Sequence, residues 1–445
     1  MSNGLMQRLS NEFKNKNVLV VGLGLQGGGI GIAKFFSELG SLVKVTDLKS
    51  KDELQDSIEQ LKVYDISYTL GEHKQEDFLK SDIIFKGPSV PWDLPELLEA
   101  EKKGVPIEME AAFTASHLKA KLIGVTGTRG KTTTTEMIYS LLKLTGKKVF
   151  KAGNISGVST INILKDAKEE DIVLFELSSW SLSGFHKKKI SPNISVFTNF
   201  YPDHLNYYKN LEDYFYDKKA IYLHQNQDDI SFINSSLKDR IDDKEVNSKI
   251  IYFDKSNFEF KLDYLKGEHN KENAAAAVLV AGEFGIIDSQ IEPVLKEFKP
   301  ERYRQEVVRK IDAVTIVNDS TSTTPTSTIK AIESFKDKPI ILILGGHSKN
   351  LPVDQLTSKL EDVSYIVLIK GSLTDEIFHE LNLKYKNKIS EVFSDLDSAI
   401  SFSFSKAKEL NEECYLILSP GATSFAMFKN EFDMGVKFNE YVAKL

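Results

Sequence analysis

The chain has 445 residues, of which 41% are hydrophobic and 27% are charged, and its formal net charge at pH 7 is −7. This composition is typical of a globular protein of about three domains, and the acidic balance argues against a surface devoted to nucleic acid. The single cysteine, Cys414, excludes a disulfide framework and a zinc ribbon. We find no apolar signal core and no apolar run of about 18 residues, which predicts a cytoplasmic protein without membrane insertion.

The first third of the chain alternates short apolar runs with helical patterns. We expect strands at Asn17–Gly22, Leu42–Asp47 and Asp82–Phe85, and a helix that ends at Gly40. Strands and helices in this order predict a parallel sheet. A new apolar run begins near residue 117 and leads into the glycine-rich segment "GVTGTRGKTTTT". We therefore place a domain boundary near residue 117.

The rest of the chain repeats this alternation. Strands are expected at Asp171–Leu177 and Ile194–Asn199, and a helix is expected in "NKENAAAAVLVAGEFG". A third set begins near Glu301, with strand candidates in "AVTIVND", "PIILILGG", "VSYIVLIK" and "CYLILSP". The sequence therefore predicts an α/β fold of three tandem domains, at 1–116, 117–300 and 301–445. The first and third are expected to be Rossmann-like, and the second to resemble a phosphate-loop ATPase.

The segment "GVTGTRGKTTTT" lies between an expected strand and an expected helix. It is typical of phosphate-binding loops, whose pattern is G-x-x-x-x-G-K-[ST]. Backbone N–H groups at a helix N-terminus can bind phosphates, Lys131 can neutralise phosphate oxygens, and the Thr132 hydroxyl can bind Mg²⁺. The segment predicts a bound nucleotide but does not say how its phosphate is used.

Two polar side chains follow the next strands. Glu176 ends the strand in "VLFELSSW", and His204 lies just beyond the strand that leads into "TNFYPDHLNYY". Open α/β sheets collect ligand groups at this edge, and a carboxylate there can bind Mg²⁺. Taken alone, either residue could be structural.

The N-terminal segment "GLGLQG" holds Gly22, Gly24 and Gly27 after a strand, and Asp47 ends the next strand. This arrangement is typical of dinucleotide binding, and read alone it suggests NAD(P). The same geometry binds any pyrophosphate, so the ligand class stays open on these residues.

The ordered set "GVTGTRGKTTTT", "GNISG", "FELSSW", "NFYPDHLNYY", "YDKKAIY", "GEHNKENAAAA", "VNDST" and "SPGATSF" resembles the ATP-dependent Mur ligases of peptidoglycan synthesis over nearly the full length. It looks most like the members that add D-glutamate to UDP-N-acetylmuramoyl-L-alanine. The resemblance implies a monomeric cytoplasmic ligase of cell wall biogenesis, and so of cell shape and division. It also implies ATP, Mg²⁺ (two ions), an acyl-phosphate intermediate, and release of ADP and phosphate. The three domains would bind the UDP-sugar, ATP and the amino acid, in chain order.

The resemblance also implies roles for individual residues. It implies the catalytic residues Lys131, Glu176, His204 and Lys218. It implies the metal ligands Thr132, Glu176, His204 and, if carbamylated, Lys218; Lys219 is a possible misassignment for Lys218. It implies ATP contacts at Gly127, Thr128, Gly130, Lys131, Thr132, Thr133, Asn270, Asn273, Arg304 and Asp319. It implies substrate contacts at Gly22, Gly24, Gly27, Asp47, Asn154, Ser178, Thr323, Lys349, Ser424 and Phe425.

Several positions depart from the family pattern. Thr321 occupies a lysine position, Tyr303 a histidine position and Ala426 a frequent aspartate position, and "FKGPSVP" matches the family's S-P-G-x loop only loosely. Lys349 is retained, and the resemblance implies that it binds the side-chain carboxylate of the amino acid; a lysine that is buried or partly buried needs such an anion, which favours an acidic amino acid. The altered loops leave the identity of the added amino acid open.

Four alternatives remain at this point. A sibling ligase would add L-glutamate, alanine, a diamino acid or a dipeptide by the same chemistry. A folylpolyglutamate synthase-like ligase should lack the "GLGLQG" domain. A nicotinamide-dependent dehydrogenase would leave the phosphate loop unused, and a nucleotide switch would require an N-K-x-D segment, whereas "NKEN" at Asn270 ends in asparagine.

Overall fold

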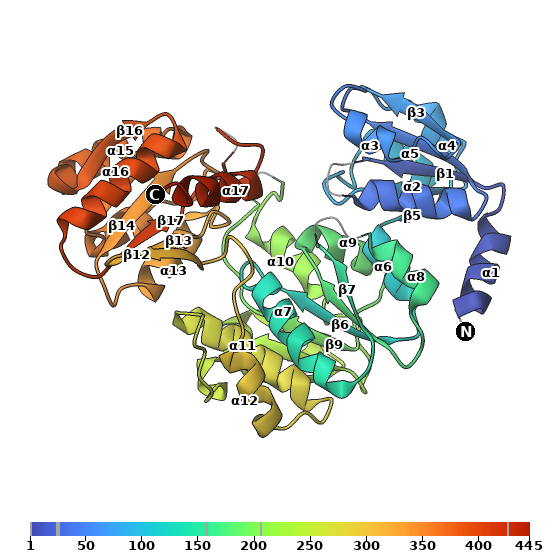
Figure 1. Ribbon diagram of the computed structural model, residues 1–445. Helices are drawn as coiled ribbons and strands as arrows, with labels where there is room; N and C mark the ends of the chain where they lie inside the picture. The colour runs from blue at the N-terminus through green and yellow to red at the C-terminus, as the bar shows by residue number, and fades with distance from the viewer. Residues whose placement is uncertain (1, 24–26, 156–158, 205–206, 425–426) are drawn as a thin grey trace. The chain divides into compact units, whose positions relative to one another are not determined.

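The structure is a computed structural model that describes the whole chain except residues 1, 24–26, 156–158, 205–206 and 425–426 (Figure 1). Three β-sheets with flanking helices follow one another along the described residues. This confirms the predicted class of three tandem α/β domains. The predicted limits at 116/117 and 300/301 stay predictions.

The first sheet has the strand order β3-β2-β1-β4-β5, and its pairs are all parallel. Its strands are β1 (Asn17–Val21), β2 (Leu42–Asp47), β3 (Ile66–Leu70), β4 (Ile83–Lys86) and β5 (Ile107–Glu108). The helices of this region are α1 (Ser2–Phe13), α2 (Gly28–Glu38), α3 (Gln55–Glu59), α4 (Gln75–Leu79), α5 (Pro95–Lys102) and α6 (Glu110–His117). Val21 pairs with both Thr46 and Lys86, so β1, β2 and β4 end at one edge of the sheet.

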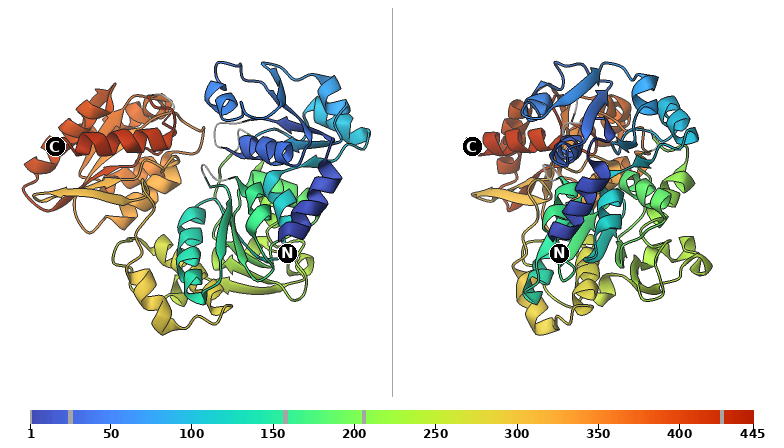
Figure 2. Two further views of the ribbon diagram at one scale, coloured as in Figure 1. Left: turned by 45° about the vertical axis from the view of Figure 1, so that its right-hand side comes forward. Right: turned by 90° about the vertical axis from the view of Figure 1, so that its right-hand side faces the viewer.

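The second sheet has the order β11-β10-β9-β6-β8-β7 and is also parallel throughout. Its strands are β6 (Lys121–Thr126), β7 (Val149–Gly153), β8 (Ile172–Glu176), β9 (Ile194–Phe197), β10 (Ile230–Asn234) and β11 (Lys249–Phe253). The helices that follow in sequence are α7 (Lys131–Leu142), α8 (Ile163–Asp166), α9 (Ser179–Lys188), α10 (Leu211–Lys219), α11 (Glu268–Gly282) and α12 (Asp288–Lys296). Helix α1 contacts α8, which joins the N-terminal segment to this second region (Figure 2).

The third sheet has the order β12-β13-β17-β14-β15-β16, in which only the β12–β13 pair is antiparallel. Its strands are β12 (Glu306–Ile311), β13 (Val314–Asn318), β14 (Ile340–Gly345), β15 (Tyr365–Ile369), β16 (Ile389–Phe393) and β17 (Cys414–Leu418). Its helices are α13 (Pro325–Ser334), α14 (Asp354–Lys359), α15 (Ser372–Tyr385), α16 (Leu396–Glu409) and α17 (Glu431–Val442). Short 3-10 helices are η1 (Lys143–Thr145), η2 (Thr160–Asn162), η3 (Ser235–Arg240), η4 (Asp243–Glu245), η5 (Lys255–Asn257), η6 (Leu360–Asp362) and η7 (Lys386–Lys388).

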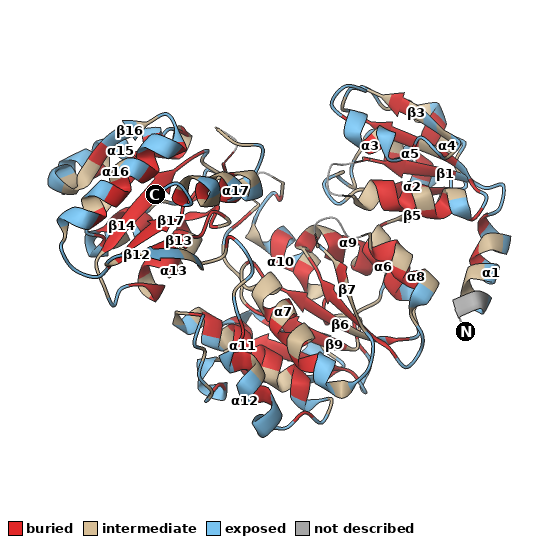
Figure 3. Ribbon diagram, viewed as in Figure 1, coloured by how far each residue is buried: buried red, intermediate tan, exposed pale blue. Residues whose placement is uncertain are grey.

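The central strands form the core of each region, as Figure 3 shows by their burial. Every residue of β8, β14 and β17 is buried. In β14, Ile341 and Ile343 pack with α16 and α17 on one face, whereas Leu342 and Leu344 pack with α14 and α15 on the other. Strands buried on both faces are uniformly apolar, which explains why these runs predict strands without alternation.

By its internal contacts the chain divides into two compact units. The first comprises Met1–Phe200, Asn210–Asp254 and Ala276–Ile287, and the second comprises Tyr201–Lys209, Lys255–Ala275 and Asp288–Leu445. The first unit therefore holds the first two sheets and the second unit holds the third. Within the described residues, no helix is both long and apolar enough to cross a membrane.

Candidate active site

The phosphate-binding loop joins β6 to α7 in the first unit. Gly127 has φ +148°, and a Cβ atom there would lie 2.0 Å from Thr198 Oγ1 and 3.1 Å from the Asn199 nitrogen, so only glycine fits. Gly130 (φ +81°) caps α7, which begins at Lys131. The N-terminus of α7 can thus present backbone N–H groups to phosphate oxygens. Gly130 is separated from Gly124 by one residue more than the strict pattern allows, so the match rests on Gly127 and on the Gly-Lys-Thr turn.

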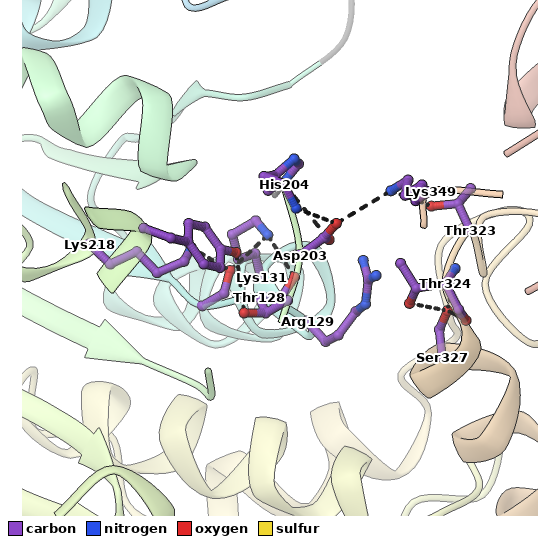
Figure 4. A network of polar contacts seen from close by, with 12 residues as sticks. Thr128, Arg129, Lys131, Asp203, His204, Lys218, Thr323, Thr324, Ser327 and Lys349 are labelled. Carbon is purple, nitrogen blue, oxygen red and sulfur yellow. Dashed lines mark hydrogen bonds and ion pairs between the residues drawn. The ribbon is translucent and has the colours of Figure 1, made fainter. Parts of the chain in front are cut away.

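Two predicted catalytic lysines converge on this loop. Lys131 Nζ donates to the carbonyl oxygens of Gly127 (2.9 Å) and Thr128 (3.1 Å), and Lys218 Nζ donates to the same Gly127 oxygen at 3.0 Å (Figure 4). Lys218 belongs to α10, is 1% exposed, and lies over the ring of Tyr214. The fold therefore brings together two cationic side chains that are 87 positions apart in sequence (218 − 131). The predicted ATP contacts Thr128 and Thr133 flank Lys131, and Thr128 Oγ1 lies 3.2 Å from Tyr214 Oη.

The predicted Mg²⁺ ligands of this unit also meet at the loop. Thr132 Oγ1 donates to Glu176 Oε1 at 3.2 Å, and Glu176 is buried at the end of β8. A hydroxyl and a carboxylate are the oxygen donors that Mg²⁺ uses beside nucleotide phosphates and water. Among the described residues, no group of three or more His, Cys, Asp or Glu side chains gathers as metal ligands. The Thr132 hydroxyl and the Glu176 carboxylate fit an ion held jointly by protein, phosphate and water.

His204 lies in the second unit, next to Asp203. It has φ +55°, its Nε2 lies 3.8 Å from Asp203 Oδ2, and its backbone N–H donates to Asp203 Oδ1 at 2.9 Å. Lys349 Nζ lies 3.6 Å from the same Asp203 Oδ1 and donates to Thr323 Oγ1 at 3.3 Å (Figure 4). Sequence reasoning missed Asp203, although it directly precedes His204. The Asp203 carboxylate lies near both His204, a predicted metal ligand, and Lys349, a predicted substrate contact.

Three predicted amino-acid contacts follow neighbouring strands of the third sheet. Thr323 follows β13, Lys349 follows β14 and Ser424 follows β17, and β17 pairs with both other strands. Ser424 Oγ is buried and has no hydrogen-bond partner among the described residues. The prediction for Phe425 falls outside the described residues. Ligands of α/β sheets bind beyond such strand ends.

Two of the departures from the family pattern touch each other. Thr321 Oγ1 donates to the Tyr303 carbonyl oxygen at 2.8 Å, and Tyr303 is buried with φ +67°. Where the pattern has a lysine and a histidine, this chain thus has a neutral hydroxyl held by the neighbouring backbone. The third departure, Ala426, lies outside the described residues.

The remaining predicted nucleotide contacts lie in the second unit. Asn273 Nδ2 donates to Asn270 Oδ1 at 3.2 Å within α11. Asp319 accepts hydrogen bonds from Ser322 Oγ and Ser419 Oγ at 2.6 and 2.8 Å, and from the backbone of Gln305 at 3.1 Å. Burial raises the pKa of Asp319 to about 6, against these hydrogen bonds and the charge of Arg304. The structure gives Asp319 a clear structural role at the end of β13.

The predicted UDP-sugar residues border a cavity of about 620 Å³ in the first unit. Gly22, Asp47 and Asn154 line it, and Asp47 Oδ2 accepts a hydrogen bond from the Leu23 backbone at 2.8 Å. Gly27 (φ +100°) caps α2 at the same sheet edge, whereas the prediction for Gly24 lies outside the described residues. Ser178 caps α9, where its Oγ accepts from the Ser181 backbone at 3.1 Å, and Ser181 lines the cavity instead.

Two ionisable residues that line the same cavity were missed from the sequence. Lys86, the last residue of β4, is 1% exposed, and burial lowers its pKa to about 7 although the charge of Asp217 raises it. Glu110, the first residue of α6, accepts from Ser159 Oγ (2.8 Å) and the Ile161 backbone (3.0 Å), and burial raises its pKa to about 7. A lysine that ends an otherwise apolar strand was the available signal for Lys86. Shifted pKa values of opposite sign in one cavity are typical of a functional site.

Comparison with protein families finds three matches in chain order. The Mur ligase MurD-like N-terminal domain matches residues 16–108, the Mur ligase middle domain matches 125–262, and the Mur ligase glutamate ligase domain matches 303–419.

Curated relatives match over almost their whole length. The UDP-N-acetylmuramoylalanine–D-glutamate ligase of Borreliella afzelii is 34% identical over 98% of this chain and 99% of its own. The ligases of the same name from Roseiflexus sp. (32%, covering 97% of this chain and 99% of that one) and Clostridioides difficile (33%, covering 98% and 100%) are similarly close.

Solved structures share the fold at lower identity. The UDP-N-acetylmuramate-alanine ligase MurC of Thermotoga maritima gives a TM-score of 0.59 at 20% identity, covering 96% of this chain and 99% of that one. The MurF ligase of the same organism, in complex with ADP, gives 0.59 at 18% identity, covering 98% and 97%.

Proposed function

The chain belongs to the Mur ligase family, and we propose that it is a cytoplasmic ATP-dependent ligase that joins D-glutamate to UDP-N-acetylmuramoyl-L-alanine in peptidoglycan synthesis. The observation that carries this proposal is the match to D-glutamate ligases over 98% of the chain at 34% identity. A fold shared with other ligases would not by itself identify the substrates of this enzyme. The enzyme would act in cell wall biogenesis, and so in cell shape and division.

The chemistry explains why such an enzyme needs a phosphate loop. A carboxylate is a poor acyl donor because its oxygen is a poor leaving group. Transfer of the γ-phosphoryl group of ATP to the substrate carboxylate gives an acyl phosphate and ADP. The amino group of D-glutamate then attacks the acyl carbon, phosphate leaves with the bonding electron pair, and the nitrogen loses a proton to give the amide.

The loop residues suit the phosphoryl transfer step. We assign Lys131 to neutralise the transferring phosphate, because its ammonium already lies within the loop at the Gly127 and Thr128 carbonyls. Thr132 and Glu176 would hold Mg²⁺, together with the phosphates and water. The ion would supply charge stabilisation and alignment of the phosphates. Within the first unit, Lys218, as a carbamate formed from its neutral amine and CO₂ with loss of a proton, is assigned to metal binding. His204, in the second unit, is assigned as a metal ligand by the family pattern.

The second unit offers groups for an acidic amino acid. Lys349 lies beside Thr323, and the buried Ser424 hydroxyl follows the neighbouring strand. A carboxylate of the amino acid would pair with the Lys349 ammonium, which is the contact that favours glutamate over neutral amino acids. Asp203 Oδ1 lies 3.6 Å from the same ammonium.

The proposal is tested by phosphate release from ATP and Mg²⁺ in the presence of UDP-N-acetylmuramoyl-L-alanine, with D-glutamate, L-glutamate and other amino acids added singly. We expect release, with formation of the amide product, only with D-glutamate. Release with a different amino acid would keep the mechanism and overturn the assigned specificity. Absence of release with all of them would overturn the ligase assignment for this acceptor.

A further inference from the structure

Lys86 lies in the cavity of the first unit without the ionic partner that a buried lysine normally has. Its Nζ donates to the Val90 carbonyl at 2.7 Å and lies at the limit of hydrogen bonding, 3.4 Å, from the Gly87 carbonyl. The ammonium also lies 4.4 Å from the centre of the Trp92 ring. Among the described residues, no carboxylate forms an ion pair with it. Because buried charges are normally paired, this site is electrostatically incomplete.

The position of Lys86 places that charge beside an anion-binding element. Lys86 pairs in register with Val21 at the end of β1, directly before the glycine turn that leads into α2. Gly28 and Gly29 at the start of α2 line the same cavity as Lys86. A Cβ atom on Gly29 would lie 2.5 Å from the Leu23 carbonyl oxygen, so the backbones of Gly29 and Leu23 approach each other closely. The N-terminus of α2, which follows β1, and the buried ammonium at the end of the adjacent strand β4 together suit a multiply charged anion.

We propose that Lys86 is a specificity-determining ligand of the substrate's diphosphate, holding it between the end of β4 and the start of α2. The inference rests on the proposed function for the presence of a diphosphate. Lys86 lies in the segment "FKGPSVP", which departs from the family pattern. The proposed role of Lys86 therefore rests on the contacts that it makes in this chain. An ammonium has three donors, and the weak contact to Gly87 leaves at least one for a phosphate oxygen.

The proposal predicts that diphosphate binding takes up a proton. Burial holds the pKa of Lys86 near 7, so above pH 7 most of the free protein carries a neutral amine, and a bound dianion restores the ammonium. The diphosphate diester does not itself titrate in this range. Other groups face the cavity from its elements: Asp47 at the end of β2, Lys49 after β2, His73 after β3, and Glu110 on α6. Asp217 on α10 acts on Lys86 by its charge, so the contribution of Lys86 must be isolated by substitution.

The test is isothermal titration calorimetry with UDP-N-acetylmuramoyl-L-alanine at pH 8, in buffers of different ionisation enthalpy. Lys86→Met is expected to bind roughly 10- to 100-fold more weakly and to lose the proton uptake of the wild type. Lys86→Arg keeps a permanent charge and is expected to bind without proton uptake. Lys51→Met removes an exposed lysine of the same domain and should change neither quantity. ADP affinity should stay unchanged in every variant.

The outcomes separate the two proposals. Equal affinity and equal proton uptake in the wild type and Lys86→Met would overturn the role of Lys86 and leave the ligase assignment intact. A wild type that does not bind the UDP-sugar would overturn the proposed function itself. If Lys86→Met fails to fold, as judged by its thermal transition, Lys86→Arg decides: proton uptake equal to that of the wild type would contradict the proposal.

Discussion

Lys131 and Lys218 both donate to the carbonyl oxygen of Gly127, at 2.9 and 3.0 Å. Two ammonium groups on one carbonyl repel each other, and this arrangement suits a loop that receives a polyanion. Carbamylation of Lys218 would replace one of the positive charges by a negative one that can bind Mg²⁺. The shared carbonyl thus brings both lysines to the loop where we propose that the nucleotide binds.

Removal of the Lys131 ammonium tests its electrostatic role. In Lys131→Ala we expect kcat to fall by roughly 10²- to 10³-fold, because a preorganised charge on the transferring phosphate is lost. We expect the melting temperature to change much less than the activity, since the two hydrogen bonds described above are to loop carbonyls. Lys143→Ala, an exposed lysine after the same helix, is the control for loss of charge. A folded Lys131→Ala protein with wild-type turnover would contradict the assignment.

Glu110 should make stability depend on pH. Its pKa is about 7 in the folded protein against 4.5 for a free glutamate, so the folded state holds the proton more tightly. Its contribution to stability is therefore full below about pH 4.5 and is lost as the pH rises through 7, by about 3 kcal/mol at most. Glu110→Gln stays neutral, so the variant should gain melting temperature relative to the wild type between pH 5 and pH 8. The melting temperatures of both proteins are measured by calorimetry at pH 5 and pH 8. The same difference between the variant and the wild type at both pH values would refute the prediction.

The site residues that the sequence could predict are those that follow buried strands within recognisable motifs. Lys131, Thr132 and Glu176 belong to this class, because parallel strands bring their carboxyl ends to one edge. Lys86 and Glu110 could not be predicted, because their place in one cavity depends on how β4 and α6 pack against other segments. Periodicity along the chain carries no information about such long-range packing.

At the scale of elements, a continuous apolar run decided which strands were predictable; β10 is buried at every residue, but Ser231 and Asn234 interrupt its apolar residues and it was not predicted. β8, β14 and β17 are buried at every residue and appear as continuous apolar runs. β3 and β12 end their sheets, are largely half-buried or exposed, and escaped the sequence analysis. The antiparallel pairing of β12 was also unpredictable, because a polar edge strand has no pattern that fixes its direction.

The phosphate loop, as an element, depends on a close backbone approach at Gly127. Gly127→Ala would place Cβ 2.0 Å from Thr198 Oγ1 at φ +148°, so the loop must shift. We expect ATP affinity to fall by about tenfold or more while the affinity for the UDP-sugar stays unchanged. Gly146→Ala is the matched control, because Gly146 also has positive φ (+70°) but no atom within 4 Å of its Cβ. Equal ATP affinity in the two variants, measured by calorimetry, would show that the close approach is unimportant.

At the scale of the whole molecule, the two units should respond separately to the UDP-sugar. All residues that line the 620 Å³ cavity belong to the first unit. At about 100 times its Kd, the ligand should stabilise the state that binds it by about 2.7 kcal/mol. Hydrogen exchange should therefore slow in segments of the first unit such as β1, β4 and α6, and stay unchanged in β13, β14 and β17. Equal slowing in both sets would contradict a site confined to the first unit.

The division into units was not predictable from the order of motifs. The short segments Tyr201–Lys209 and Lys255–Ala275 carry His204 and Asn270, yet they cluster with the last third of the chain. Contacts across long sequence separations decide this membership, and local composition does not record them. Three sheets in sequence were predictable, whereas the exchange of segments between units was not.

This exchange limits how the protein can be divided. A gene split after codon 287 would give one fragment with the complete first unit but also with two orphaned segments of the second. Its complement, Asp288–Leu445, would contain the whole third sheet and lack the stretch with His204 and Asp203, whose carboxylate lies beside Lys349. Neither fragment would therefore correspond to one unit alone. During synthesis, most of the chain must leave the ribosome before the second unit can fold.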